Sequence, residues 1–158
     1  MKISAQDEYG LRVLLRIARA DKNEGITIPQ LVEAEGLSQS YVAKLTRTLR
    51  IADLIQSSRG QKGGYTLSRP AAEITINHAL KALGGTFFDN NFCGSHSGNL
   101  NLCTNSVDCS VRSLWKIIKF TLDQVLDRIT LNDLLGCETK VSISLKKILE
   151  EKLPSISA

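Results

Sequence analysis

The spacing of hydrophobic residues predicts a first helix near the N-terminus. In the stretch AQDEYGLRVLLRIAR, which follows Ser4, the residues Leu11, Leu14, Leu15 and Ala18 recur at three- and four-residue intervals and share one helical face. Ser4 has the chemistry of an N-cap, and acidic residues follow it in the first turn. These features predict an amphipathic helix that packs an apolar face into a core.

The next hydrophobic pattern predicts two helices separated by a short turn. Thr27 stands three residues before a glutamine, which is capping-box spacing, and a helix is expected over residues 28–34. Gly36 supplies the turn, and Ser38 can cap a third helix that continues to about Ala52. This order of helix, turn and helix is typical of a DNA-binding domain.

The third helix has an apolar face and a polar face. Its inward positions are Val42, Leu45, Leu49 and Ala52. Amides, hydroxyls and cations occupy the other face, and such groups pair with base edges and phosphates in a major groove. We therefore expect DNA contacts from Ser38, Gln39, Ser40, Tyr41, Lys44 and Arg47.

A β-hairpin is expected directly after this helix. The segments 54–58 and 64–67 have strand character, and the glycine-rich sequence RGQKGG joins them. Its tip carries Arg59, Gln61 and Lys62, which suit a phosphate backbone or a minor groove. The expected fold class is therefore mostly α with a small β-hairpin, a winged helix-turn-helix followed by a long dimerisation helix.

Charge is distributed unevenly along the chain. The 158 residues have a formal net charge of +4, and residues 38–70 hold six basic side chains but only one acid, Asp53. The excess positive charge thus coincides with the expected DNA-binding elements, which indicates double-stranded DNA as a partner. No run of about 18 apolar residues exists, and the N-terminus lacks a secretory signal, so we expect no membrane contact and a cytoplasmic location.

The second half of the chain predicts an extension from the winged domain. Residues 1–85 form the expected DNA-binding domain, and residues 86–110, rich in Asn, Gly and Ser, form a cysteine-bearing loop. Residues 111–137 contain a long amphipathic helix and a short closing helix, and residues 138–158 form a tail with one further helix. The long apolar stripe, from Val111 to Ile129, favours a homodimer.

Three cysteines lie in the loop, and their spacing bears on metal chemistry. Nine residues separate Cys93 from Cys103, and five separate Cys103 from Cys109. Thiolates are the natural ligands of iron-sulfur clusters, whereas the close cysteine pairs typical of zinc sites are absent. We expect these three thiols to hold a cluster, with a clusterless thiol sensor as the alternative. Cys137 lies outside the loop.

Two stretches resemble a known family. The wing and following helix, RGQKGGYTLSRPAAEITINHALKALGG, and the opening MKISAQDEYGLRVLLRIA are similar to the Rrf2 family of bacterial transcription regulators, over roughly residues 1–137. The resemblance implies a winged helix-turn-helix, a homodimer with a crossed pair of long helices, and an iron-sulfur cluster at three loop cysteines.

The chain also departs from the family pattern. The gap between its first two loop cysteines is longer than usual, so the cluster type, 2Fe-2S or 4Fe-4S, stays open. Arg112 occupies the position of a histidine ligand in IscR-like members, and Ala43 occupies that of a discriminating glutamate. The resemblance offers Glu8 of the partner subunit as a fourth ligand, with Asp7 beside it; the competing candidates are His96 and Cys137.

These observations favour a dimeric DNA-binding regulator that senses iron, redox state or nitric oxide through a cluster. A cytoplasmic redox or metal protein is the alternative from another class. An enzyme is not expected, because the chain has only two histidines and no nucleophile motif. The operator, the signal and the sign of regulation cannot be read from the residues.

Overall fold

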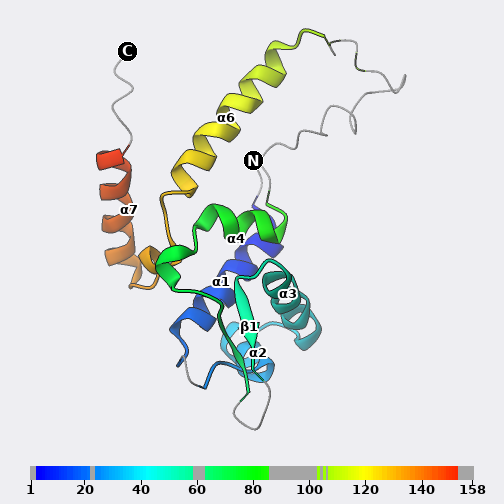
Figure 1. Cartoon of the computed structure of the whole chain (residues 1–158), viewed down its shortest axis with the longest axis vertical. Helices are drawn as coiled ribbons and strands as arrows, with labels where there is room; N and C mark the ends of the chain where they lie inside the picture. Colours follow the sequence, from blue (N-terminus) through cyan, green and yellow to red (C-terminus); the bar gives the residue numbers. More distant parts are fainter. Residues whose placement is uncertain are drawn as a thin grey trace.

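The computed structural model describes residues 3–21, 24–58, 63–85, 103, 105 and 107–152. Within these ranges the chain is mostly helical, with a two-stranded hairpin (Figure 1). The elements are α1 (Ala5–Arg19), α2 (Ile28–Glu35), α3 (Gln39–Ile51), β1 (Ile55–Ser57), β2 (Tyr65–Leu67), η1 (Ala71–Glu73), α4 (Ile76–Leu83), α6 (Ser110–Leu126), η2 (Leu131–Leu134) and α7 (Glu138–Lys152). The expected fold class is confirmed. The part of the chain that the structure describes contains no helix long and apolar enough to cross a bilayer.

Local capping chemistry fixes where the helices of the winged domain begin. Ser4 and Thr27 each form a capping box, and Ser38 and Thr75 each accept a hydrogen bond from an amide three residues later. These side chains satisfy amides that have no partner within the helix. The predicted starts of the helices that follow Ser4, Thr27 and Ser38 are therefore confirmed.

The core of the winged domain forms around α1. The buried face of this helix consists of Gly10, Val13, Leu14 and Ile17, together with the carboxylate of Asp7. The sequence pattern had centred this face on Leu11, Leu15 and Ala18 as well as Leu14, but those three are only partly buried. The face is rotated because α1 packs against α3 and α4, and Gly10 permits a close approach to a leucine of α4.

The hairpin is anchored at its base to the segment before α2. Strands β1 and β2 pair antiparallel, with Ser57 opposite Tyr65. Tyr65 also exchanges two backbone hydrogen bonds with Ile26, at 2.8 and 3.0 Å. Strands β1 and β2 are shorter than the predicted segments 54–58 and 64–67. The additional bridge between Ile26 and Tyr65 pairs the outer side of β2 with the segment before α2.

A second backbone connection joins the winged domain to the long helix α6. Thr75 and Thr130 form an isolated antiparallel bridge, and the amide of Ile76 donates to the carbonyl of Ile129 at 2.9 Å. From this junction α6 extends away from the winged domain, and α7 starts beside η2 and contacts it (Figure 1). The expected closing helix is a 3₁₀ turn capped by Thr130, and the tail contains the expected further helix, α7.

Candidate nucleic-acid interface and cysteine segment

The first turn of α3 presents a compact group of polar side chains. Ser38 caps the helix: its Oγ accepts from the amide of Tyr41 at 3.3 Å and lies 3.3 Å from Oγ of Ser40. Gln39 and Ser40 are exposed, whereas Tyr41 is partly buried. The structure thus places hydroxyl and amide groups together at a helix N-terminus, an arrangement that can donate to and accept from nucleic-acid groups.

The rest of α3 is held by its apolar face. Val42, Leu45 and Leu49 are fully buried, as the pattern predicted, whereas Ala52 is only partly buried. On the opposite side Lys44 and Arg47 are exposed. The two cations therefore follow the polar first turn along one exposed face, where they can reach phosphates.

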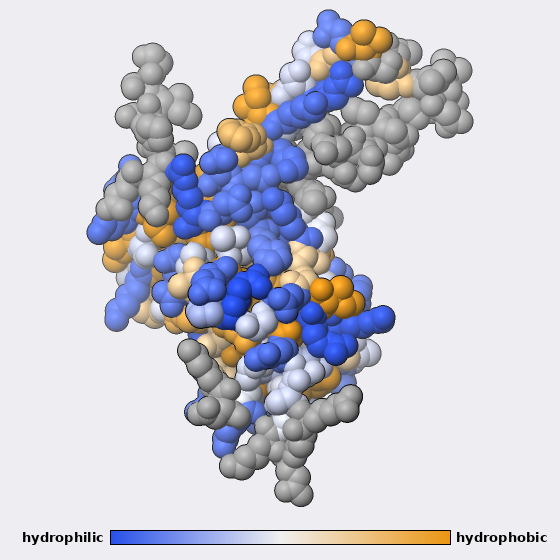
Figure 2. Space-filling view, viewed as in Figure 1, coloured by the Kyte–Doolittle hydropathy of each residue, from blue (hydrophilic) through white to orange (hydrophobic). Residues whose placement is uncertain are grey.

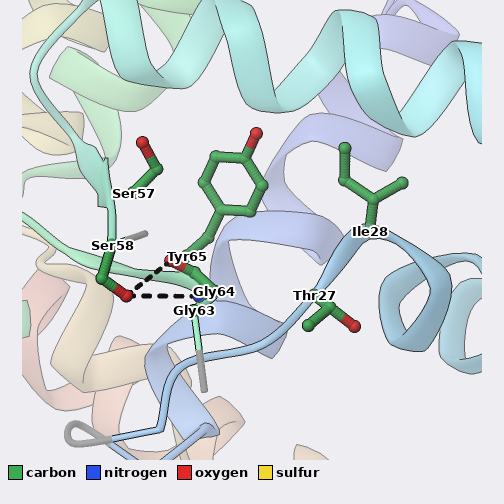
Figure 3. A pocket seen from close by; sticks show the side chains of 7 residues that line it. All are labelled: Thr27, Ile28, Ser57, Ser58, Gly63, Gly64 and Tyr65. Atoms are coloured by element: carbon green, nitrogen blue, oxygen red, sulfur yellow. Dashed lines mark hydrogen bonds between the residues drawn. The ribbon is translucent and has the colours of Figure 1, made fainter. Parts of the chain in front are cut away.

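The base of the wing forms a shallow hollow beside α2 (Figure 3). Its volume is about 300 Å³, and its lining includes the hydroxyl residues Thr27, Ser57 and Ser58. Ser58 is committed to the hairpin, because its Oγ accepts from the amide of Gly64 at 3.2 Å. Arg59, Gln61 and Lys62, the candidate contacts of the wing tip, lie outside the described residues.

Two arginines of α1 clamp a buried acid of α2, a feature that the hydrophobic pattern did not identify. Arg12 Nε and Arg16 Nε each lie 2.9 Å from one carboxylate oxygen of Glu35. The Glu35 side chain is only 4% exposed. The spacing of the arginines, one turn apart on α1, was the only available signal, and an amphipathic helix shows such spacing for many other reasons.

The cysteine segment is described only at its C-terminal end. Cys103 and Cys109 are both partly buried, and Cys109 is the N-cap of α6, where its Sγ accepts from the amide of Arg112 at 3.3 Å. A helix N-terminus favours negative charge. Cys137 is exposed and precedes α7. Cys93 and His96 lie outside the described residues, and within the described ranges no three metal-binding side chains gather.

Asp7 and Glu8, the two acids in the first turn of α1, differ in their exposure to solvent. Glu8 is exposed, whereas Asp7 is 6% exposed and caps α1 through Ser4. Oδ1 of Asp7 is buried without a hydrogen-bond partner among the described residues. A Cβ added at Gly85, the last described residue before the cysteine segment, would lie 2.8 Å from it. Asp7 therefore has a structural role at this junction, and Glu8 is the acid available to another molecule.

Comparison with known proteins identifies the family. The sequence profile described as Rrf2, iron-dependent transcriptional regulator, matches residues 3–136. The chain belongs to the Rrf2 family. It is 28% identical to the structure of T. potens IscR, with a TM-score of 0.64 over 98% of this chain and 93% of that one. It is 31% identical to Staphylococcus aureus CymR in its oxidised form, with a TM-score of 0.64 over 86% and 97% of the two chains.

A curated relative supports the same assignment. A putative HTH-type transcriptional regulator of Mycobacterium tuberculosis is 27% identical over 136 residues, which cover 86% of this chain and 82% of the relative. The resemblance that the wing and α1 sequences indicated is therefore confirmed. As a member of the Rrf2 family this chain is a DNA-binding transcriptional regulator.

Proposed function

We propose that this Rrf2 family protein is a homodimeric, cytoplasmic regulator that senses iron, redox state or nitric oxide through an iron-sulfur cluster. The observation that carries the proposal is the position of Cys109. This residue ends the cysteine segment and caps α6, so its sulfur belongs both to the sensing segment and to the helix proposed for dimerisation. A change at the thiol therefore acts directly on the start of that helix.

The surface of α6 supports the homodimer. Val111 and Leu114 of the predicted stripe are 58% and 52% exposed, and two further apolar side chains of α6, Ile117 and Phe120, are 64% and 65% exposed. Orange, hydrophobic side chains lie along α6 and at the end of this helix that points away from the winged domain (Figure 2). Burial of such a surface against the same helix of a second copy would remove it from water and place two copies of α3 on one DNA duplex.

DNA recognition is assigned to α3 and the wing. Ser38, Gln39, Ser40 and Tyr41 form the end of α3 that would enter the major groove, and Lys44 and Arg47 would reach the backbone. Arg59, Gln61 and Lys62 are proposed for the wing contact. We expect Arg59→Ala to lower affinity and to reduce the salt dependence of binding by about one phosphate contact. Gln39→Ala should instead change the preferred sequence.

The donor set fits an iron-sulfur cluster. Cys93, Cys103 and Cys109 would supply three thiolates, and Glu8 of the partner subunit would supply a carboxylate. The exposure of Glu8 at the first turn of α1 is consistent with donation to another subunit. A bound cluster would supply reversible one-electron chemistry and reactivity toward oxidants and nitric oxide.

The test is anaerobic purification of the full-length protein, followed by absorbance spectroscopy and by iron and acid-labile sulfide analysis. Stoichiometric iron and sulfide with visible absorbance would support the proposal. Protein that contains neither, even after reconstitution with ferrous iron and sulfide, would contradict it. Light scattering at micromolar concentration tests the dimer in the same preparation, and a monomer would contradict that part.

A clusterless thiol-based regulator is the second candidate. Its support is the 31% identity to CymR, whose structure was determined in an oxidised form, together with two partly buried thiols near the start of α6. In this case hydrogen peroxide would oxidise two cysteine thiols to one disulfide and would itself be reduced to water. Peptide mass spectrometry of metal-free protein after peroxide treatment detects this disulfide. A disulfide that accompanies a change in DNA affinity favours this candidate, because the cluster proposal requires none.

A further inference from the structure

An aromatic contact joins α1 to the first turn of α3. The rings of Tyr9 and Tyr41 have centroids 6.1 Å apart and an interplanar angle of 84°. This is an edge-to-face pair, which is the preferred geometry for aromatic side chains at this separation. Both rings are partly buried and pack against the core. Tyr41 therefore has a defined neighbour on the side that faces the protein.

Tyr9 is itself held from its other side. The guanidinium carbon of Arg12 lies 5.5 Å from the centroid of the Tyr9 ring, within the range of a cation-π contact. The same guanidinium is fixed by the ion pair with the buried carboxylate of Glu35 in α2. The ring of Tyr9 is consequently set by α1 and α2 together, and it transmits their position to α3.

The position of Tyr41 determines that of the polar group beside it. The amide of Tyr41 donates to Oγ of Ser38, and the residues between them, Gln39 and Ser40, are exposed. A shift of Tyr41 would therefore move the cap and the two side chains most suited to base edges. Base contacts depend on close alignment, whereas phosphate contacts by flexible cations tolerate small displacements.

We propose that Tyr9 is a positioning residue for operator recognition. It acts through Tyr41: its ring, braced by Arg12, holds the first turn of α3 in the orientation that reads base edges. This inference rests on the proposed use of residues 38–41 in DNA recognition. It predicts that loss of the Tyr9 ring lowers affinity for the operator more than affinity for unrelated DNA, because Lys44 and Arg47 stay on their exposed face.

The test compares Tyr9→Leu with Tyr9→Phe in the full-length protein. Phenylalanine keeps the ring and removes only the hydroxyl, whereas leucine keeps apolar volume and removes the ring. Leu15→Ala is the matched control, because Leu15 lies on the same helix and is also partly buried against the core. The probes are a duplex selected from a random library by the wild-type protein and a scrambled duplex of equal composition, both at one fixed salt concentration.

We expect Tyr9→Leu to lower the ratio of selected-duplex to scrambled-duplex affinity by about tenfold. Tyr9→Phe and Leu15→Ala should keep the wild-type ratio. An unchanged ratio in Tyr9→Leu would overturn the inference, and so would an equal fall in Leu15→Ala. A wild-type protein that selects no sequence would instead contradict the proposed function, which keeps the two failures distinct.

Tyr41→Leu provides a second route if Tyr9→Leu does not fold. It should lower the same ratio, and wild-type behaviour in this variant would overturn the inference. Where both single variants fold, the double variant should lower the ratio no further than the larger single effect. Both substitutions remove the same contact, that between the rings of Tyr9 and Tyr41. Additive losses in the double variant would show that the two rings act separately, against the proposal.

Discussion

Asn77 and Asp127 form a hydrogen bond between the winged domain and the long helix. Nδ2 of Asn77 lies 2.8 Å from Oδ1 of Asp127, and Asn77 is 2% exposed. Asn77 belongs to α4, and Asp127 is the C-cap of α6. The bond therefore fixes the base of α6 beside the backbone bridge between Thr75 and Thr130.

Removal of this bond should loosen the junction. Asn77→Ala is expected to lower the free energy of unfolding by about 1–2 kcal/mol. The substitution removes a buried amide donor, so the Asp127 carboxylate loses this hydrogen bond. Urea denaturation measures the loss. Asp127→Ala and the double variant complete a mutant cycle, and simple additivity of the two losses would show that the bond contributes nothing.

A second prediction concerns the acid clamped between α1 and α2. Glu35→Gln keeps the size of the side chain but leaves the guanidinium groups of Arg12 and Arg16 without their carboxylate. We expect a loss of about 1 kcal/mol in the free energy of unfolding, since the arginines are 45% and 40% exposed and solvent screens the pair. Glu33→Gln, on the exposed side of α2, is the control and should be neutral.

The contrast between α1 and Glu35 shows how far sequence reasoning reaches. Ser4, Thr27 and Ser38 were predicted as helix caps because capping is local and depends on residues three positions apart. The buried face of α1 was only partly predicted, because the faces of α3 and α4 that cover it are distant in sequence. The Glu35 clamp was missed for the same reason.

In the candidate site, too, features set within one helix were predicted, and features set by contacts between helices were not. The exposed positions of Gln39, Ser40, Lys44 and Arg47 followed from helical periodicity alone. The contact between Tyr9 and Tyr41 depends on how two helices cross, and no spacing within either helix indicates it. The set of cluster ligands and the contacts of the wing tip remain predictions, since Cys93, Arg59 and their neighbours lie outside the described residues.

Asp123 provides a prediction for pH dependence. Burial acts to raise the pKa of its carboxyl, but the hydrogen bond from Lys119 and the charge of Lys81 outweigh burial and hold the pKa below its ordinary value. Its Oδ2 lies 2.5 Å from Nζ of Lys119, and its Oδ1 lies 3.5 Å from Nζ of Lys81. The folded state thus releases this proton more readily than the unfolded state.

The resulting stabilisation is complete above the unfolded-state pKa of about 3.9 and is lost as pH falls through the lower pKa of the folded state. Asp123→Asn should therefore be less stable than the wild type at pH 6, with the difference shrinking toward pH 3. Urea midpoints across this range measure the effect. Glu73→Gln, at an exposed position, should follow the wild-type curve, and a constant deficit in Asp123→Asn would contradict the assignment.

Gly64 should not tolerate a side chain at the base of the wing. A Cβ at this position would lie 2.8 Å from the amide nitrogen of Ile26 and 3.0 Å from the carbonyl carbon of Gly25. Both atoms belong to the backbone, so the hairpin must move away from the segment before α2. Gly64→Ala is expected to cost about 1–3 kcal/mol in the free energy of unfolding and to weaken DNA binding.

Gly136→Ala is the matched control for this change, because its Cβ would lie 3.4 Å from Cγ2 of Val141 and 4.0 Å from the backbone nitrogen of Val141, both ordinary contacts. Thermal denaturation and DNA retention should both match the wild type for this variant. Wild-type DNA affinity in Gly64→Ala would show that the bridge between Tyr65 and Ile26 does not position the wing.

The last prediction tests the assignment of the thiols. Serine at Cys93, Cys103 or Cys109 should abolish or destabilise the cluster while the protein stays folded, because the core of the winged domain contains no cysteine. Cys137→Ser should retain the cluster, since Cys137 is exposed and lies beyond α6. Iron and sulfide content after anaerobic purification measures cluster retention in the four single variants. Operator affinity is then compared among the same four variants.

The Cys109 variant carries additional information because its sulfur also caps α6. Serine is itself a good N-cap, so Cys109→Ser should preserve the start of the helix while it removes the thiolate. Cys109→Ala removes both the thiolate and the cap. If a cluster regulates DNA affinity, the two variants should lose the same regulation, because both lack the ligand, and only the alanine variant should also lose helix stability. Full cluster retention in the loop variants, or equal loss in Cys137→Ser, would show that other thiols bind the cluster.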